Sequence, residues 1–101
     1  MRYIQRLAEI TTKELSDDDY CVRDAFNTVI AGDAAACTFC IRPHKSSGWQ
    51  VFCHEPARGL IYQDYHLDTE REACIKFIEM TDRYYHLSKY LGEFEEGKKI
   101  A

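Results

Sequence analysis

The stretch 48–92 constrains the fold more than any other part of the chain. It contains two strand-like runs, residues 48–55 and 60–67, which are separated only by the short turn 56–59. A connection this short joins antiparallel neighbours, because parallel strands need a long crossover between them. A helical pattern begins at Thr69, directly after the second run. The segment therefore predicts a β-hairpin that leads into a helix.

The helix after the hairpin has the clearest local signals. Thr69 and Glu72 fit a capping box, in which each side chain bonds the backbone N–H of the other residue. Gly92 is placed to end the helix, since glycine readily adopts the left-handed conformation common at helix ends. A stripe along one side comprises Cys74, Phe77, Ile78, Thr81, Tyr84, Tyr85, Ser88 and Leu91. We expect one long helix over 69–91, and a charged tail over 93–101 that would be disordered alone.

The N-terminal part predicts two further helices. Over residues 2–15, apolar side chains recur at helical spacing, and charged side chains lie on the other side. Ser16 or Asp17 can accept hydrogen bonds from the first turn of a second helix over 16–31, which would stop at Gly32-Asp33. The buried face of that second helix would comprise Val22, Ala25, Phe26, Val29 and Ile30.

The remaining pattern completes a small mixed fold. Alternation of side chains over residues 35–42 predicts a strand, which the polar turn 43–48 joins to the hairpin. A chain of 101 residues is the size of one domain. We therefore expect a single α+β domain over 1–101 with the order α-α-β-β-β-α. A three-stranded antiparallel meander would pack against the helices, and its other face would be partly exposed.

The charge balance and the cysteines limit the classes of function. Lys plus Arg number 13 and Asp plus Glu number 17, so the net charge of −4 disfavours nucleic-acid binding and suits a basic protein partner. Ordinary solvating charge gives the same small balance. The N-terminus lacks the apolar core of a signal peptide, and no apolar run approaches the ~20 residues of a membrane span. We expect a cytoplasmic protein whose five cysteines are reduced.

Cys37 and Cys40 form a Cys-x-x-Cys motif, and His44, Cys53 and His54 lie near it in the sequence. Zinc ligands must converge on one point, but residues three apart on a strand face opposite sides of the sheet. A second such motif is absent. The alternative role for these thiols is that of small core hydrophobes. We therefore expect no bound metal and no cofactor.

Cys53 and His54 also raise the alternative of a cysteine nucleophile. Adjacent strand residues point to opposite faces, so His54 cannot activate Cys53. Asp64 is an isolated acid, and the sequence has no glycine-rich phosphate loop. We therefore expect a binding protein rather than an enzyme.

Three motifs follow one another within residues 48–80. They are Trp49-x-Val51, Glu55-x-x-x-Gly59 and Asp68-Thr69-Glu70-x-Glu72-Ala73-Cys74-x-x-Phe77-Ile78. Together they resemble small immunity proteins of bacterial polymorphic-toxin systems, including contact-dependent growth inhibition. The turn departs from the Glu-Arg-Gly pattern of such proteins, because Pro56-Ala57-Arg58 separate Glu55 from Gly59. The resemblance implies a cytosolic protein that binds and blocks one cognate toxin domain, and it does not name the toxin's activity. A nuclease is one candidate, because nuclease domains are often basic and would suit an acidic inhibitor. The alternative is a small regulatory or adaptor module that binds another cytosolic protein.

Aromatic and acidic residues indicate where such a partner would bind. Tyrosine is enriched in protein–protein hot spots because it buries a large area at low entropic cost. Tyr62 and Asp64 lie two apart on one strand and should therefore project from the same face. We predict an interface on this face, joined by Glu55 near the hairpin turn and by Asp17, Asp18 and Asp19. The outer stripe of the long helix, which includes Tyr90, is the alternative.

Overall fold

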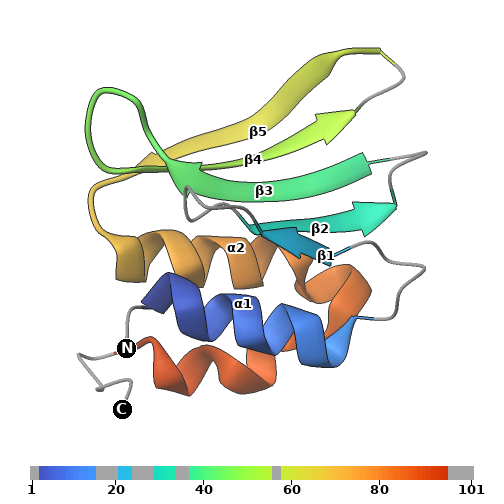
Figure 1. Cartoon of the computed structure of the whole chain (residues 1–101), viewed down its shortest axis with the longest axis vertical. Coiled ribbons are helices and arrows are strands. Elements are labelled where there is room, and N and C mark those ends of the chain that lie inside the picture. Colours follow the sequence, from blue (N-terminus) through green and yellow to red (C-terminus); the bar gives the residue numbers. More distant parts are fainter. Residues whose placement is uncertain (1–2, 16–20, 24–28, 34–36, 56–57, 96–101) are drawn as a thin grey trace.

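The computed structural model describes residues 3–15, 21–23, 29–33, 37–55 and 58–95. The described elements are α1 (Tyr3–Glu14), β1 (Cys21–Arg23), β2 (Val29–Asp33), β3 (Cys37–Pro43), β4 (Trp49–Glu55), β5 (Leu60–Leu67), α2 (Glu70–Tyr85) and the 3-10 helix η2 (Leu87–Glu93). The strands form one antiparallel sheet in the order β1-β2-β3-β4-β5, and the described helices lie on one side of it (Figure 1). The α+β class is confirmed, but the predicted order α-α-β-β-β-α is wrong.

The helix predicted over residues 16–31 is wrong where the structure describes that segment, at β1 and β2. β2 pairs with β3, and this pairing sets Val29 opposite Ile41. Val29 and Ala31 are both buried and lie two residues apart, as one face of a strand requires. Val29 is β-branched and therefore packs well on a pleated surface. Gly32, which we expected to end a helix, lies inside β2 instead.

The predicted meander is present as β3, β4 and β5. On β4, Trp49, Val51 and Cys53 are buried on the side that faces the helices, as their alternation predicted. α1 and α2 cover this side of the sheet with their apolar faces. Full burial of one large aliphatic or aromatic side chain contributes about 1.5–3 kcal/mol, so burial in this layer stabilises the fold. The core comprises Ile4, Leu7, Ala8, Ile10, Leu15, Val29, Ala31, Phe39, Ile41, Trp49, Val51, Cys53, Ala73, Cys74, Phe77, Ile78, Leu87 and Phe94.

α2 begins as predicted and ends earlier than predicted. The N–H of Glu72 donates to Thr69 Oγ1 at 3.1 Å, which confirms Thr69 as the N-cap. At the other end, His86 adopts a left-handed conformation with a φ of 56°, so the helix stops at Tyr85 instead of Gly92. The turn directs the fully buried Leu87 into the core. The free energy of burying this side chain compensates for a conformation that residues other than glycine seldom adopt.

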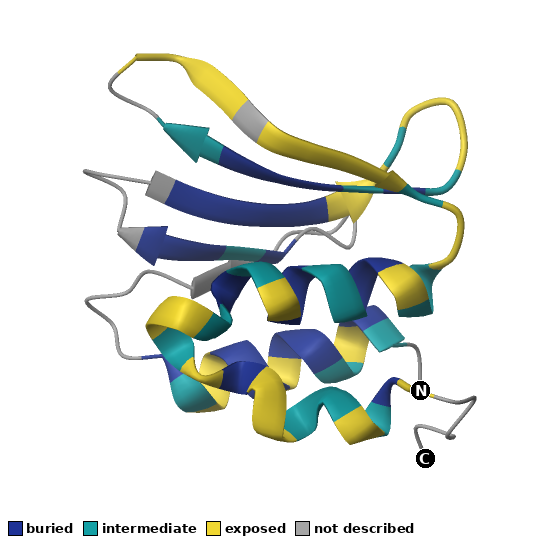
Figure 2. Cartoon of the chain, turned by 180° about the vertical axis from the view of Figure 1, so that it is seen from behind, coloured by how far each residue is buried: buried dark blue, intermediate teal, exposed yellow. Residues whose placement is uncertain are grey.

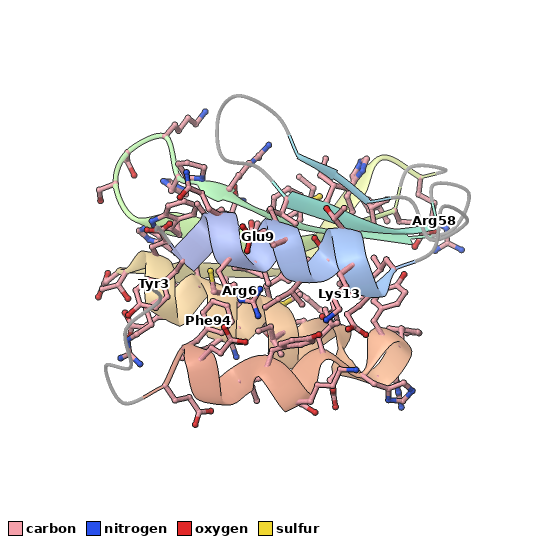
Figure 3. The ribbon with its side chains drawn as sticks, turned by 60° about the horizontal axis from the view of Figure 1, so that its bottom comes forward. Tyr3, Arg6, Glu9, Lys13, Arg58 and Phe94 are labelled. Atoms are coloured by element: carbon pink, nitrogen blue, oxygen red, sulfur yellow. The ribbon has the colours of Figure 1, made fainter. Side chains whose placement is uncertain are left out.

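The segment after α2 packs against α1. Arg6 donates to both carboxylate oxygens of Glu93, from Nε at 2.7 Å and from Nη2 at 2.9 Å. Phe94 is fully buried, and its ring centroid lies 5.9 Å from that of Tyr3 (Figure 3). The carbonyl of Phe94 accepts a hydrogen bond from Arg71 Nη1 at 3.0 Å. Contacts with α1 and α2 thus hold Glu93 and Phe94 of the expected tail in place, and residues 96–101 lie outside the described residues.

We expect this packing to weaken in acid. The hydrogen bonds from Arg6 hold the pKa of Glu93 below its usual value, and a hydrogen bond from the Tyr90 hydroxyl, followed by one from Lys89, does the same for the pKa of Glu14. A carboxylate whose folded pKa is lowered stabilises the fold above its usual pKa of 4.5 and loses that contribution as the pH falls through the folded value. The free energy of unfolding should therefore decrease below about pH 4.5.

Urea unfolding between pH 3 and pH 7 measures this dependence. Glu93→Gln should make the free energy of unfolding depend less on pH, because an amide does not titrate. The control is Glu95→Gln, which removes an exposed carboxylate just beyond these contacts. A curve for Glu93→Gln as steep as that of Glu95→Gln would show that the Arg6–Glu93 pair does not contribute.

Candidate functional site

β5 is an edge strand with exposed apolar side chains. Leu60 and Ile61 are each 49% exposed and Tyr65 is 40% exposed. Figure 2 shows exposure along nearly the whole strand, whereas β4 beside it is mostly buried. An edge strand also presents unpaired backbone N–H and C=O groups, to which another chain can add a strand. This edge is therefore the first candidate for a binding surface.

A bulge interrupts β5 at its centre. The pairing with β4 shifts between Val51 and Cys53, and Gln63 has a φ of 52°. Side-chain alternation does not continue through a bulge. Tyr62 is the backbone partner of Cys53, while Asp64 accepts a hydrogen bond from Gln50 Nε2 at 2.9 Å on the sheet face away from the helices. Spacing along β5 therefore does not assign Tyr62 and Asp64 to one face, and the Tyr62 side chain lies outside the described ones.

The structure separates Glu55 from Asp64, the two predicted interface residues whose side chains it describes. Glu55 forms an ion pair with Arg58 at 3.1 Å and lies opposite Leu60 in the register, at the far end of β4. Asp64 contacts Gln50, which lies on β4 five residues before Glu55. Five residues of an extended strand span about 17 Å. Glu55 and Asp64 are thus not neighbours. Asp17, Asp18 and Asp19 lie outside the described residues.

An exposed aromatic residue lies at the end of α2. Tyr84 is 58% exposed, and its ring centroid lies 5.6 Å from that of Phe39. The helical stripe placed Tyr84 on the same side as Phe77 and Ile78, and Ile61 was not singled out. Neither pattern revealed the exposure of these two residues, because neither shows that β5 is an edge or that α2 ends at Tyr85.

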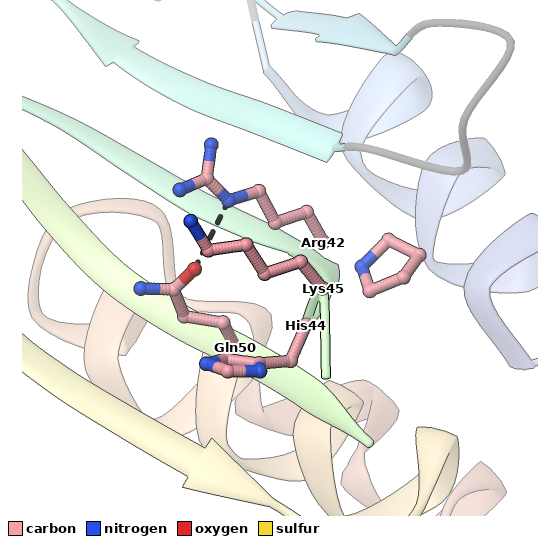
Figure 4. A pocket seen from close by; sticks show the side chains of 5 residues that line it. Arg42, His44, Lys45 and Gln50 are labelled. Atoms are coloured by element: carbon pink, nitrogen blue, oxygen red, sulfur yellow. Dashed lines mark hydrogen bonds between the residues drawn. The ribbon is translucent and has the colours of Figure 1, made fainter. Parts of the chain in front are cut away.

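A second candidate lies on the sheet face away from the helices. A hollow of about 420 Å³ is lined by Arg42, Pro43, His44, Lys45 and Gln50, and we call it the basic hollow (Figure 4). Arg42 Nε donates to Gln50 Oε1 at 3.0 Å, and the guanidinium carbon lies 4.7 Å from the centroid of the Phe52 ring. We did not predict this site from the sequence. Arg42, His44 and Lys45 lie within four consecutive positions, but their spacing does not show that strand pairing sets Gln50 beside Arg42.

Two histidines stack beside the basic hollow. The ring centroids of His44 and His66 are 4.6 Å apart. His44 Nδ1 accepts from the backbone N–H of Ser46 at 3.2 Å, and His66 Nε2 lies 2.7 Å from the Ser47 carbonyl, which can only accept. In its neutral form His44 therefore carries its proton on Nε2.

The cysteines differ from the sequence prediction. Cys53 is disulfide-bonded, so the expectation that all five thiols are reduced is wrong. Its partner is not among the described side chains. Cys40 and Cys74 are free and buried, and burial raises the pKa of both thiols, which makes them poor nucleophiles. Within the described residues, no group of three or more His, Cys, Asp or Glu side chains is arranged to hold a metal ion.

Comparison with models of protein families, with curated proteins and with solved structures finds no match to this chain. The helices among the described residues are too short or too polar to cross a membrane.

Proposed function

We propose that this protein is an immunity protein, which binds a toxin domain and blocks it. The observation that carries the proposal is the exposure of Leu60, Ile61 and Tyr65 along an edge strand. Large apolar side chains at an unpaired edge invite association with another chain, and proteins usually protect such edges. A partner that adds a strand to β5 would pair its backbone groups and cover these side chains. The resemblance of residues 48–80 to immunity proteins supports a toxin as that partner.

The charge of the chain supports a basic partner. A nuclease toxin is often basic because it must approach phosphates, and a net charge of −4 would then speed its encounter with this protein. The alternative is a regulatory module that uses the same edge to bind another protein. Only the identity of the partner separates these two functions.

Affinity capture from the native cell identifies that partner. Recovery of a toxin domain at 1:1 supports the immunity function, and recovery of only housekeeping proteins contradicts it. The proposed location is the cytoplasm. Because disulfides persist mainly in oxidising compartments, the disulfide of Cys53 makes an extracytoplasmic location the alternative. The capture should therefore be done separately on cytoplasmic and extracytoplasmic fractions.

We expect Ile61→Asp to weaken binding of the captured partner at least tenfold, mainly through faster dissociation, because it introduces a charge into a covered apolar contact. Ile61 is half exposed in the free protein, so stability should change by less than about 1 kcal/mol. Surface-immobilised binding kinetics measure the first effect, and thermal unfolding measures the second. The matched control is Thr12→Asp, at an exposed position on α1. Equal dissociation rates for the two variants would place the interface elsewhere.

A further inference from the structure

We propose that the basic hollow is a binding site for a phosphate group, separate from the protein-binding edge at β5. Its central feature is the guanidinium of Arg42, which neighbouring side chains hold in one orientation. Three contacts produce that orientation, and they leave one edge of the guanidinium unused.

The first two contacts form a row across the sheet. Asp64 Oδ1 accepts from Gln50 Nε2 at 2.9 Å, and Gln50 Oε1 accepts from Arg42 Nε at 3.0 Å. A carboxylate can only accept, so it sets the amide of Gln50 with the nitrogen toward Asp64 and the oxygen toward Arg42. The amide in turn orients the guanidinium. Asp64 is therefore engaged at the far end of the row, with Gln50 between it and Arg42.

The third contact covers one face of the guanidinium. Arg42 lies over the ring of Phe52, which is itself buried. Stacking on an aromatic ring restricts the plane of the guanidinium and shields that face from water. Nε and one face of the group are thus occupied, and both Nη atoms remain as donors. A guanidinium in this state is preorganised for two parallel hydrogen bonds to one oxyanion.

Further donors line the same hollow. Lys45 is exposed and has no carboxylate partner among the described residues. His44 adds the Nε2–H that its bonding to Ser46 leaves free. A phosphate group matches this set because it offers several acceptor oxygens and about two negative charges, whereas a carboxylate offers two oxygens and one charge. The volume of about 420 Å³ lies within the ~300–1,000 Å³ range of small-molecule pockets. It can therefore hold a small phosphate ester as well as free phosphate.

The test is a titration of the protein with inorganic phosphate that is monitored by NMR. The ionic strength is kept constant so that general electrostatic screening does not change. We expect saturable shifts of the Arg42 Nε resonance and of backbone resonances over residues 42–50. Adenosine monophosphate in the same titration distinguishes the sources of the phosphate group. If adenosine monophosphate binds more tightly than inorganic phosphate, the site takes a nucleotide or another phosphate ester. If the two bind equally, the site takes the free phosphate ion. Acetate should bind at least tenfold more weakly than phosphate, and equal affinity would overturn the proposal.

Variants separate a built site from general attraction by positive charge. Arg42→Gln should weaken phosphate binding at least tenfold. The control, Arg83→Gln, removes the same charge from an exposed position on α2 and should bind like the wild type. Gln50→Leu keeps every charge but removes the group that orients Arg42, and it should weaken binding several-fold. Thermal unfolding of each variant verifies that it is folded. Equal phosphate affinities for Arg42→Gln and Arg83→Gln, or an unchanged affinity in Gln50→Leu, would show that no such site exists.

Discussion

Gly48→Ala is expected to lower the free energy of unfolding by about 3 kcal/mol. A Cβ at this position would lie 2.6 Å from the carbonyl oxygen of Leu67 and 2.9 Å from His66 Nε2. The first of these is a backbone atom of β5, so relieving the clash would require the turn and the strand to move apart. Gly48 also has a φ of 71°, which side chains other than glycine tolerate poorly.

Gly59→Ala is the matched control for this prediction. Gly59 has a similar φ of 64°, but a Cβ there would meet nothing within 4 Å. It should therefore show only the conformational cost, about 1 kcal/mol. Urea unfolding of both variants measures the difference. Equal losses would show that the approach of Gly48 to Leu67 is not tight, and that only its backbone conformation matters.

Phe94→Ala should destabilise the protein by about 3–5 kcal/mol, the usual cost of removing a large buried aromatic side chain. Phe94 is fully buried beside Tyr3, and its carbonyl accepts a hydrogen bond from Arg71. The truncation would leave a cavity at the point where the C-terminal segment joins α1 and α2. We also expect amide hydrogen exchange over residues 87–94 to accelerate, because this segment would lose its main apolar anchor.

The control for Phe94→Ala is Tyr84→Ala, which truncates an aromatic residue that is 58% exposed. Its cost should be below about 1 kcal/mol, since most of its side chain is already in water. Chemical denaturation of the two variants provides the comparison. A loss for Phe94→Ala as small as that for Tyr84→Ala would mean that the segment 87–94 does not pack stably against the helices.

Residues 29–33 show why the helix predicted over 16–31 is wrong, whereas the helix predicted over 2–15 is present as α1. The apolar positions before Gly32 fit a helical face, and the same Val29 also fits a strand beside Ala31. The local pattern cannot choose between these structures. The presence of β3 decides between them. Pairing with β3 satisfies the backbone N–H and C=O groups of β2 and places Val29 and Ala31 where they are buried. A gain of this kind depends on the pairing of Val29 with Ile41 and of Ala31 with Phe39, which lies outside the local pattern of residues 29–33.

The candidate sites depend even more on distant residues. The exposure of Ile61 follows from the edge position of β5, and the orientation of Asp64 follows from the bulge at Gln63. Gln63 is not a glycine, so nothing in the sequence marks this conformation. The cations of the basic hollow become a site only when the sheet register sets Arg42 beside Gln50. Sequence spacing alone therefore placed the interface on a face that the bulge disrupts.

The sequence by itself determined the hairpin of β4 and β5, the N-cap at Thr69 and the mixed α+β class. These features depend on turn length, side-chain alternation and hydrogen bonds between residues only a few positions apart. Only the tertiary structure decided that β2 is a strand, that β5 is an exposed edge and that Glu93 lies against Arg6, 87 residues away. The physical reason is that burial and strand pairing are shared among distant segments. Their free energy exists only once the whole chain is arranged, so no local pattern records it.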